Sequence, residues 1–182
     1  GNDLPPRHER GQSLRSLDFI LEHEPTLADS TKKFVVNRML DSESESRIIE
    51  SLERRGVDYL HLPFEAEVYR QIPLDYACLP RGDRAHLKSR SFRRLKPRHK
   101  IRLLTAVNRL RNNYVMHNNG ARNAALRDGK RLAKWVLPFD GNCFLSASAW
   151  AQFRSAVIER PWLKYFIVPM ARIQKNDQLL DK

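Results

Sequence analysis

The chain has 182 residues, of which 41% are hydrophobic and 30% charged, so it suits one folded domain with a real core. No apolar run approaches the roughly 18 residues that a membrane-spanning helix needs, and the opening GNDLPPRHER lacks the apolar centre of a signal peptide. We therefore expect no transmembrane segment. The net charge of +12 indicates a partner or ligand that carries negative charge.

The first third of the chain predicts a strand–helix–strand unit. Leucines at helical spacing indicate a helix from about Leu14 to His23, and an apolar run rich in β-branched residues indicates a strand over Phe34–Asn37. Ser42 and Glu45 fit a capping box at the start of the next helix, which Gly56 ends. A second strand follows from Val57 to Leu62. The short connections favour parallel pairing of the two strands.

A basic segment follows over residues 81–102. It holds ten Lys or Arg residues and one acid, Asp83. Such an excess of positive charge attracts phosphates, nucleic acid or acidic glycans, although a solvated helix face explains the same run and stays open as the alternative. The candidate polyanion patch comprises Arg90, Arg93, Arg94, Lys96, Arg98, Lys100 and Arg102.

The basic segment leads into a predicted amphipathic helix. Its apolar stripe consists of Leu103, Val107 and Leu110. Another face of the helix is expected to carry the basic residues Arg98, Arg102 and Arg109. The patch is thus expected on a loop and one side of this helix.

The last third of the chain predicts two more helices and two more strands. The helices are expected over about Ala121–Arg127, capped by Asn119 or Gly120, and over Ser146–Glu159; the strands are expected in KWVLPF (residues 134–139) and over Tyr165–Val168. Helices that alternate with short buried runs predict an α/β fold with a Rossmann-like, mostly parallel layered sheet and helices on both faces. Cys78 and Cys143 are expected to be free thiols.

Polar residues follow three of the predicted strands. Asn37 and Arg38 follow the first, Glu65 lies shortly after the second, and Asp140-Gly141-Asn142 follows the third. Ligands of open parallel sheets bind beyond the carboxyl ends of the strands. One carboxylate beside amide oxygens suits Mg²⁺ or Mn²⁺ when a diphosphate supplies further oxygens. A turn cap at Asp140 and a simple strand end at Asn37 are the structural alternatives.

The stretch NNGARNAALRDG followed by WVLPFDGN resembles the core of GT-A glycosyltransferases of the family 2 type. In that family a glycine and an Arg-Asn pair open a helix, and the apolar strand after it ends in an acidic metal motif. Gly120, Arg122 and Asn123 match the helix signature, and Asp140 matches the first acid of the motif. The motif here reads Asp-Gly-Asn, so a second acid is missing.

The resemblance implies a single domain over residues 1–182 that binds a nucleotide-sugar donor with a divalent metal (Mn²⁺ or Mg²⁺) and transfers the glycosyl group to a hydroxyl of a glycan or protein acceptor. The donor-binding residues would be Asn37, Arg38, Asn119, Gly120, Arg122, Asn123, Asp140 and Asn142, with Asp140 also at the metal.

The family takes its catalytic base and acceptor contacts from chain after the metal motif. Only residues 143–182 follow here, so the acceptor part is expected to be incomplete, and no base is assigned. The alternative function is a non-enzymatic polyanion-binding module that uses residues 81–102. The chain is expected to be soluble, with a cytoplasmic location, or a Golgi lumenal one if a targeting segment has been removed.

Overall fold

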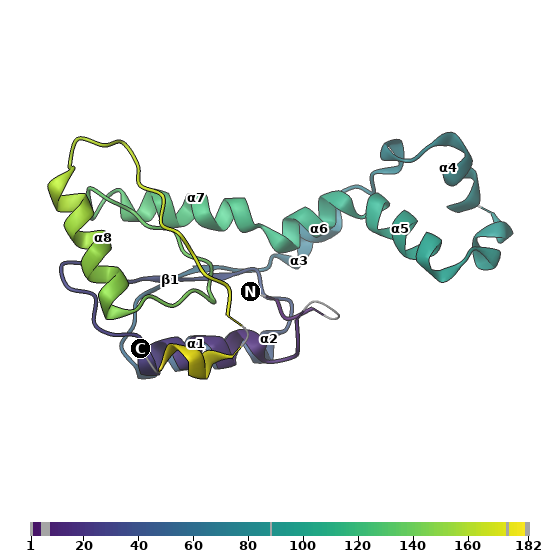
Figure 1. Cartoon of the computed structure of the whole chain (residues 1–182). Helices are drawn as coiled ribbons and strands as arrows, with labels where there is room; N and C mark the ends of the chain where they lie inside the picture. Colours follow the sequence, from purple (N-terminus) through teal and green to yellow (C-terminus); the bar gives the residue numbers. More distant parts are fainter. Residues whose placement is uncertain (1, 5–7, 88, 174, 181–182) are drawn as a thin grey trace.

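The structure is a computed structural model that describes residues 2–4, 8–87, 89–173 and 175–180 (Figure 1). In chain order the elements are α1 (Gln12–His23), β1 (Phe34–Asn37), α2 (Ser42–Arg54), β2 (Tyr59–Leu62), α3 (Ala66–Gln71), η1 (Tyr76–Cys78), α4 (Arg81–Leu87), η2 (Arg90–Arg94), α5 (Pro97–Val107), α6 (Arg109–Met116), α7 (Asn118–Gly129), α8 (Ala147–Glu159) and η3 (Asn176–Leu179).

The predicted strand–helix–strand unit is confirmed. β1 and β2 pair in parallel, in a register that runs from Phe34 opposite Tyr59 to Asn37 opposite Leu62. α2 connects them, and Gly56 follows it with a φ of 63°, a conformation that glycine adopts without strain. The N-cap of α2 is Asp41, not the predicted Ser42. The Asp41 carboxylate accepts a hydrogen bond from the Ser44 hydroxyl at 2.6 Å.

The two strands lie between helices (Figure 1). α1 and α2 cover one face, where Leu17, Val36 and Leu52 are at most 5% exposed and form the main core. α7 runs over the other face, in the direction opposite to β1, because Lys33 before β1 pairs with Asp128 near the end of α7 at 2.8 Å. The fold is therefore α/β, with helices on both faces of a small parallel sheet.

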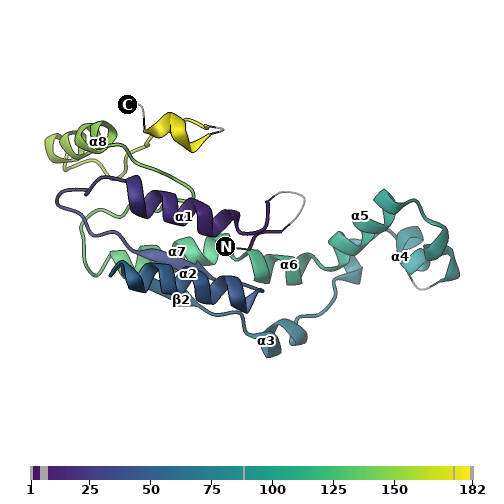
Figure 2. The same cartoon turned by 90° about the horizontal axis from the view of Figure 1, so that it is seen from below.

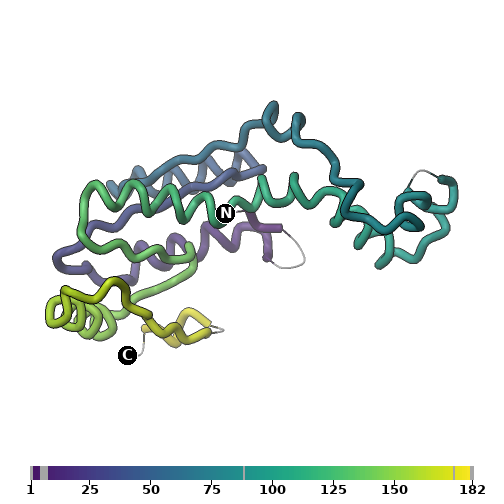
Figure 3. The backbone as a smooth tube through the Cα atoms, turned by 90° about the horizontal axis from the view of Figure 1, so that it is seen from above, coloured from purple at the N-terminus to yellow at the C-terminus, as the bar shows by residue number. Residues whose placement is uncertain are grey.

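The chain between β2 and α6 forms a separate helical lobe, defined here as residues 74–107 without residue 88. It contains η1, α4, η2 and α5 and extends away from the sheet in all three views (Figures 1, 2 and 3). Leu79, Leu103 and Val107 form a second core inside it. The lobe thus has an apolar centre of its own.

The long amphipathic helix predicted after the basic segment is divided. α5 ends at Val107, and α6 begins at Arg109. Leu103 and Val107 are buried as predicted, but Leu110 is 37% exposed because it lies on the second helix. Arg109 does not share a face with the basic residues of α5, since it bonds to Asp75 at 2.9 Å.

The two strands predicted in the last third are wrong. Residues 134–139 and 165–168 belong to no helix or strand and have no backbone hydrogen-bond partner in the described chain, whose sheet has two strands. Pro138 removes a backbone donor from the first segment. The segments pack instead through side chains: Trp135 and Phe166 have ring centroids 5.2 Å apart, and Phe166 also lies against Phe153 of α8. Burial of aromatic rings against α8 has replaced strand pairing.

The last predicted helix is confirmed as α8. Ser146 is its N-cap, and its hydroxyl accepts a hydrogen bond from the backbone N–H of Ala149 at 3.3 Å. Trp150 joins this helix to the loop after α1 through a hydrogen bond from Nε1 to the Ala28 carbonyl at 3.1 Å. Cys78 and Cys143 are free thiols, as predicted.

Candidate functional site

The site begins at Asn37, the last residue of β1. Its side chain is 9% exposed, and Nδ2 donates to the Met116 carbonyl at 3.0 Å. Its Oδ1 is fully buried and has no hydrogen-bond partner among the described residues. Buried amide oxygens nearly always have a donor, so an unpaired one at this strand end is unusual.

Arg38 is held against α6 directly beside Asn37. Its Nη1 donates to the Tyr114 carbonyl at 2.8 Å, and its guanidinium carbon lies 3.8 Å from the centre of the Tyr114 ring. Its backbone has a φ of 40°, in the left-handed region that non-glycine residues rarely adopt. Such a conformation persists only where the surroundings fix it, and it is frequent at functional sites.

Tyr114 also brings the end of β2 to this place. Its hydroxyl accepts a hydrogen bond from the backbone N–H of Glu65 at 3.2 Å. The first two predicted strand ends therefore meet on one tyrosine. The Glu65 side chain itself is exposed and makes no recorded hydrogen bond, so only its backbone belongs to this group.

His117 forms the junction between α6 and α7. It too has a left-handed backbone, with a φ of 42°, and it serves as C-cap of one helix and N-cap of the next. Its ring lies directly on Gly120, where any Cβ atom would overlap it. Partial burial, together with the positive charge of Arg38, lowers the pKa of His117. The ring therefore stays neutral at neutral pH.

α7 begins at Asn118 with His117 as its N-cap, so neither predicted cap, Asn119 or Gly120, is at that position. Gly120 therefore lies within the first turn. The space in which a Cβ atom of residue 120 would lie is filled by the His117 ring, so the absence of a side chain at Gly120 leaves room for this ring and not for a ligand. The side chains of Asn119 and Asn123 are exposed and make no recorded hydrogen bonds. They border the site without being fixed in it.

The third predicted strand end reaches α7 through an ion pair. Arg122 Nη2 pairs with Asp140 Oδ1, and both side chains are about half exposed. Asn142 is exposed beyond it. The structure thus brings together the residues of the predicted signature and the predicted acid, although the segment before Asp140 is not a strand.

Few possible metal ligands surround Asp140. No cluster of three or more His, Cys, Asp or Glu side chains occurs within the described residues. Asp140 supplies one carboxylate, and Arg122 already neutralises it. The residues present do not form a metal site by themselves, so no mechanistic step is assigned to a metal here.

Sequence reasoning missed the contributions of Tyr114, Met116 and His117. Met116 acts through its backbone carbonyl, which no side-chain pattern reveals. The position of Tyr114 depends on the break between α5 and α6, because that break turns α6 toward the end of β1. For His117 the only signal in the sequence was Gly120, three residues later, because a glycine there leaves space for the histidine ring.

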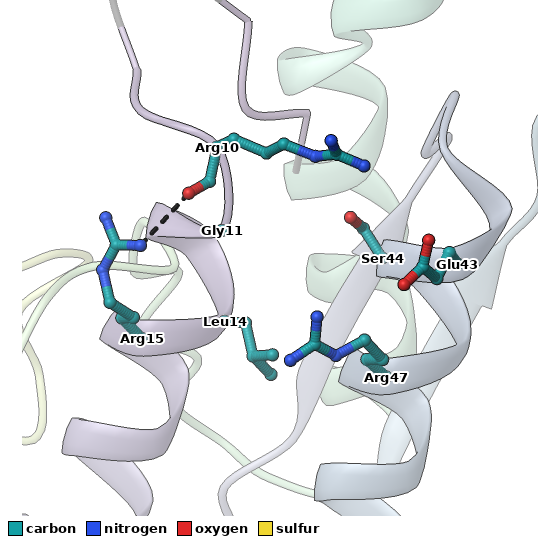
Figure 4. A pocket seen from close by; sticks show the side chains of 7 residues that line it. All are labelled: Arg10, Gly11, Leu14, Arg15, Glu43, Ser44 and Arg47. Carbon is teal, nitrogen blue, oxygen red and sulfur yellow. Dashed lines mark hydrogen bonds between the residues drawn. The ribbon is translucent and has the colours of Figure 1, made fainter.

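A second feature lies between the first turns of α1 and α2. It is a cavity of about 360 Å³ lined by Arg10, Gly11, Leu14, Arg15, Glu43, Ser44 and Arg47 (Figure 4). The Arg15 guanidinium already has partners within the protein, since it donates a hydrogen bond to the Arg10 carbonyl and forms an ion pair with Glu9, each at 3.1 Å. Glu43 places a carboxylate among the guanidinium groups, so the cavity has mixed charge and is assigned no ligand.

Comparison with known proteins gives no relative: no protein-family model matches the chain, and neither the curated proteins nor the solved structures contain a significant match. Within the described residues, no helix combines the length and the apolar character needed to cross a bilayer.

Proposed function

We propose that the chain is a GT-A-like domain that binds a nucleotide-sugar donor at the carboxyl end of β1 and transfers its glycosyl group to an acceptor hydroxyl. The observation that carries the proposal is the position of Asn37 and Arg38, which lie at the carboxyl end of β1 and bond to the backbone carbonyls of Met116 and Tyr114 beside the junction of α6 and α7.

The fold supports the same proposal at a coarser level. A parallel strand pair with α1 and α2 on one face and α7 on the other is the arrangement expected at the start of a Rossmann-like, GT-A-like layered sheet. Ligands of such sheets bind beyond the carboxyl ends of the strands. Asn37 and Arg38 occupy this position.

The proposed roles follow from the charge and polarity of the side chains at the site. The guanidinium groups of Arg38 and Arg122 would bind the diphosphate, because a planar, permanently charged group matches phosphate oxygens. The same charges would stabilise the diphosphate as it leaves. Asp140 would bind hydroxyls of the donor sugar. The exposed side chains of Asn119, Asn123 and Asn142 would add further polar contacts.

The divalent metal remains a prediction. With one carboxylate available, an Mn²⁺ or Mg²⁺ ion would depend on oxygens from the bound diphosphate. Titration of a nucleoside diphosphate by calorimetry, with Mn²⁺ and then with EDTA, tests this. Equal affinity in the two buffers would remove the metal role from Asp140 and leave it a hydroxyl contact.

Donor binding is tested by thermal shift with UDP, GDP, CDP and ADP, since a ligand of the native state raises the melting temperature. At least one of them should do so. Arg122→Ala should weaken that binding about tenfold, which corresponds to 1.4 kcal/mol. Arg127→Ala is the matched control, because Arg127 is an exposed residue of the same helix without a recorded side-chain partner.

Two results would contradict the proposal. One is the absence of a shift with every nucleoside diphosphate. The other is an equal loss of affinity in Arg122→Ala and Arg127→Ala, which would indicate a general charge effect and not a site. Polyanion binding in a chain without donor affinity would favour the alternative function, a non-enzymatic polyanion-binding module.

A further inference from the structure

The helical lobe is built independently of the candidate site. Its core of Leu79, Leu103 and Val107 is at most 5% exposed and has no member from the sheet region. Its connection to the rest of the chain includes the ion pair between Asp75 and Arg109 of α6 at 2.9 Å. Substitutions on its surface can therefore be made without touching the donor site.

Some of the basic residues of the lobe stabilise the lobe itself. Arg84 donates to the Leu79 carbonyl at 2.9 Å. Lys100 donates to the Arg93 carbonyl at 2.8 Å and lies over the Phe92 ring. Arg102 pairs with Asp83 at 3.5 Å. Two residues of the predicted patch, Lys100 and Arg102, therefore contact other residues of the lobe.

The other Lys and Arg residues of the described lobe share two properties. They are exposed, and their side chains form no hydrogen bond or ion pair with another described residue. They are Arg81, Arg90, Arg93, Arg94, Lys96 and Arg98. The two acids of the lobe cannot compensate them, because Asp75 is paired with Arg109 and Asp83 with His99 and Arg102. The lobe therefore presents uncompensated positive charge to solvent.

We propose that this surface of the lobe binds an anionic glycan, a polymer whose sugars carry carboxylate or sulfate groups. Five of its six free cations are arginines, which bond to two oxygens of such groups at once. A non-specific single-strand nucleic-acid surface stacks successive bases on aromatic rings. Here Phe92 packs against the lobe core, and of the exposed large hydrophobic residues of the described lobe, which are Tyr76, Ile101 and Leu104, only Tyr76, at 42%, carries an aromatic ring.

The choice of a glycan over nucleic acid rests on the proposed function. A glycosyl acceptor must present hydroxyl groups, and a polymeric acceptor must be held beside the donor site over several sugar units. The lobe extends from the segment between β2 and α6, whose ends both lie at the candidate site through Glu65 and Tyr114. Charge on the lobe would hold the polymer while its hydroxyl reaches the donor.

The test measures binding of the full chain to immobilised heparin and to polygalacturonate as anionic glycans, to dextran as a neutral one, and to single-stranded and duplex DNA. The test variant is Arg93→Gln/Arg94→Gln/Lys96→Gln. The matched control is Arg127→Gln/Arg131→Gln/Lys134→Gln, which removes the same charges from exposed positions outside the lobe that have no recorded side-chain partner. Melting temperatures confirm that both variants are folded.

Both anionic glycans should bind and dextran should not. The test variant should lose at least tenfold in affinity, and its dependence of log K on log salt should flatten, because fewer counterions are released. The control should bind as the unmodified chain does. Equal losses in both variants, or tighter binding to single-stranded or duplex DNA than to either anionic glycan, would overturn the proposal.

Failure of this proposal is separate from failure of the proposed function. Glycan binding is measured without a donor, and the test variant should keep its thermal shift with nucleoside diphosphates because none of its substitutions touches Asn37, Arg38 or Arg122. Loss of both binding activities in the test variant would indicate that the lobe is not an independent surface, and would overturn the proposal as well.

Discussion

The side-chain amide of Asn37 donates a hydrogen bond of 3.0 Å to the backbone carbonyl of Met116. This bond joins the end of β1 to the junction of α6 and α7, two segments that lie 79 positions apart in the chain. It also orients Asn37 so that its oxygen points into the protein without a partner. Loss of this side chain therefore has a structural effect and a proposed functional one.

Asn37→Ala should lower the free energy of unfolding by about 1–3 kcal/mol, because it leaves the Met116 carbonyl without its donor. Urea denaturation measures the change. Asn113→Ala is the control, since the Asn113 side chain is exposed on α6 without a recorded hydrogen bond, and it should shift stability by less than about 0.5 kcal/mol. Similar losses in both variants would show that the Asn37 bond contributes little.

Gly120→Ala should destabilise the protein by about 1–3 kcal/mol, because the added methyl group overlaps the His117 ring. The same change in a His117→Ala background should be neutral or stabilising by up to about 1 kcal/mol, since alanine favours helix over glycine. The coupling between the two positions is read from a double-mutant cycle. Gly82→Ala in α4 provides a reference, because a Cβ there meets no atom within 4 Å. A coupling of zero would contradict the ring contact.

Stability should fall between about pH 7 and pH 5, partly because of His117. Its pKa in the folded protein lies below the ordinary value of 6.5 through burial and through Arg38. As the pH falls below 6.5 the unfolded chain takes up a proton that the folded one does not, so the unfolded state gains stability. His117→Gln should reduce this pH dependence, as followed by denaturation at several pH values. An NMR titration that places the pKa of His117 above 6.5 would contradict the assignment.

The helical lobe should loosen when its connection to the sheet region is weakened. The hydrogen bond from Arg109 is the main cause of the lowered pKa of Asp75, so the stability from this pair is present above the ordinary value of 3.8 and is lost as the pH falls through the lowered pKa. Asp75→Asn at neutral pH should speed hydrogen exchange in α4 and α5. Asp58→Asn, at an exposed residue outside the lobe, should leave it unchanged.

The strand–helix–strand unit and α8 followed from local patterns, whereas the two later strands did not form. β1 was predicted with its observed ends, and β2 and α2 to within two residues, because apolar periodicity and a glycine stop act within a few positions. The runs 134–139 and 165–168 have strand composition as well. They remain unpaired here because Trp135 and Phe166 bury each other instead of joining the β1–β2 pair.

The sequence by itself determined the residue types of the candidate site. It placed Asn37 and Arg38 at a strand end, Arg122 on the helix before Asp140, and the excess of cations in residues 81–102. Only the tertiary structure decided which of these groups meet: Asp140 pairs with Arg122, Arg38 stacks on Tyr114, and His117 occupies the space above Gly120. Composition and spacing act along the chain, whereas these contacts depend on the break between α5 and α6 and on the path of α7 over the sheet, which packing over long sequence distances fixes.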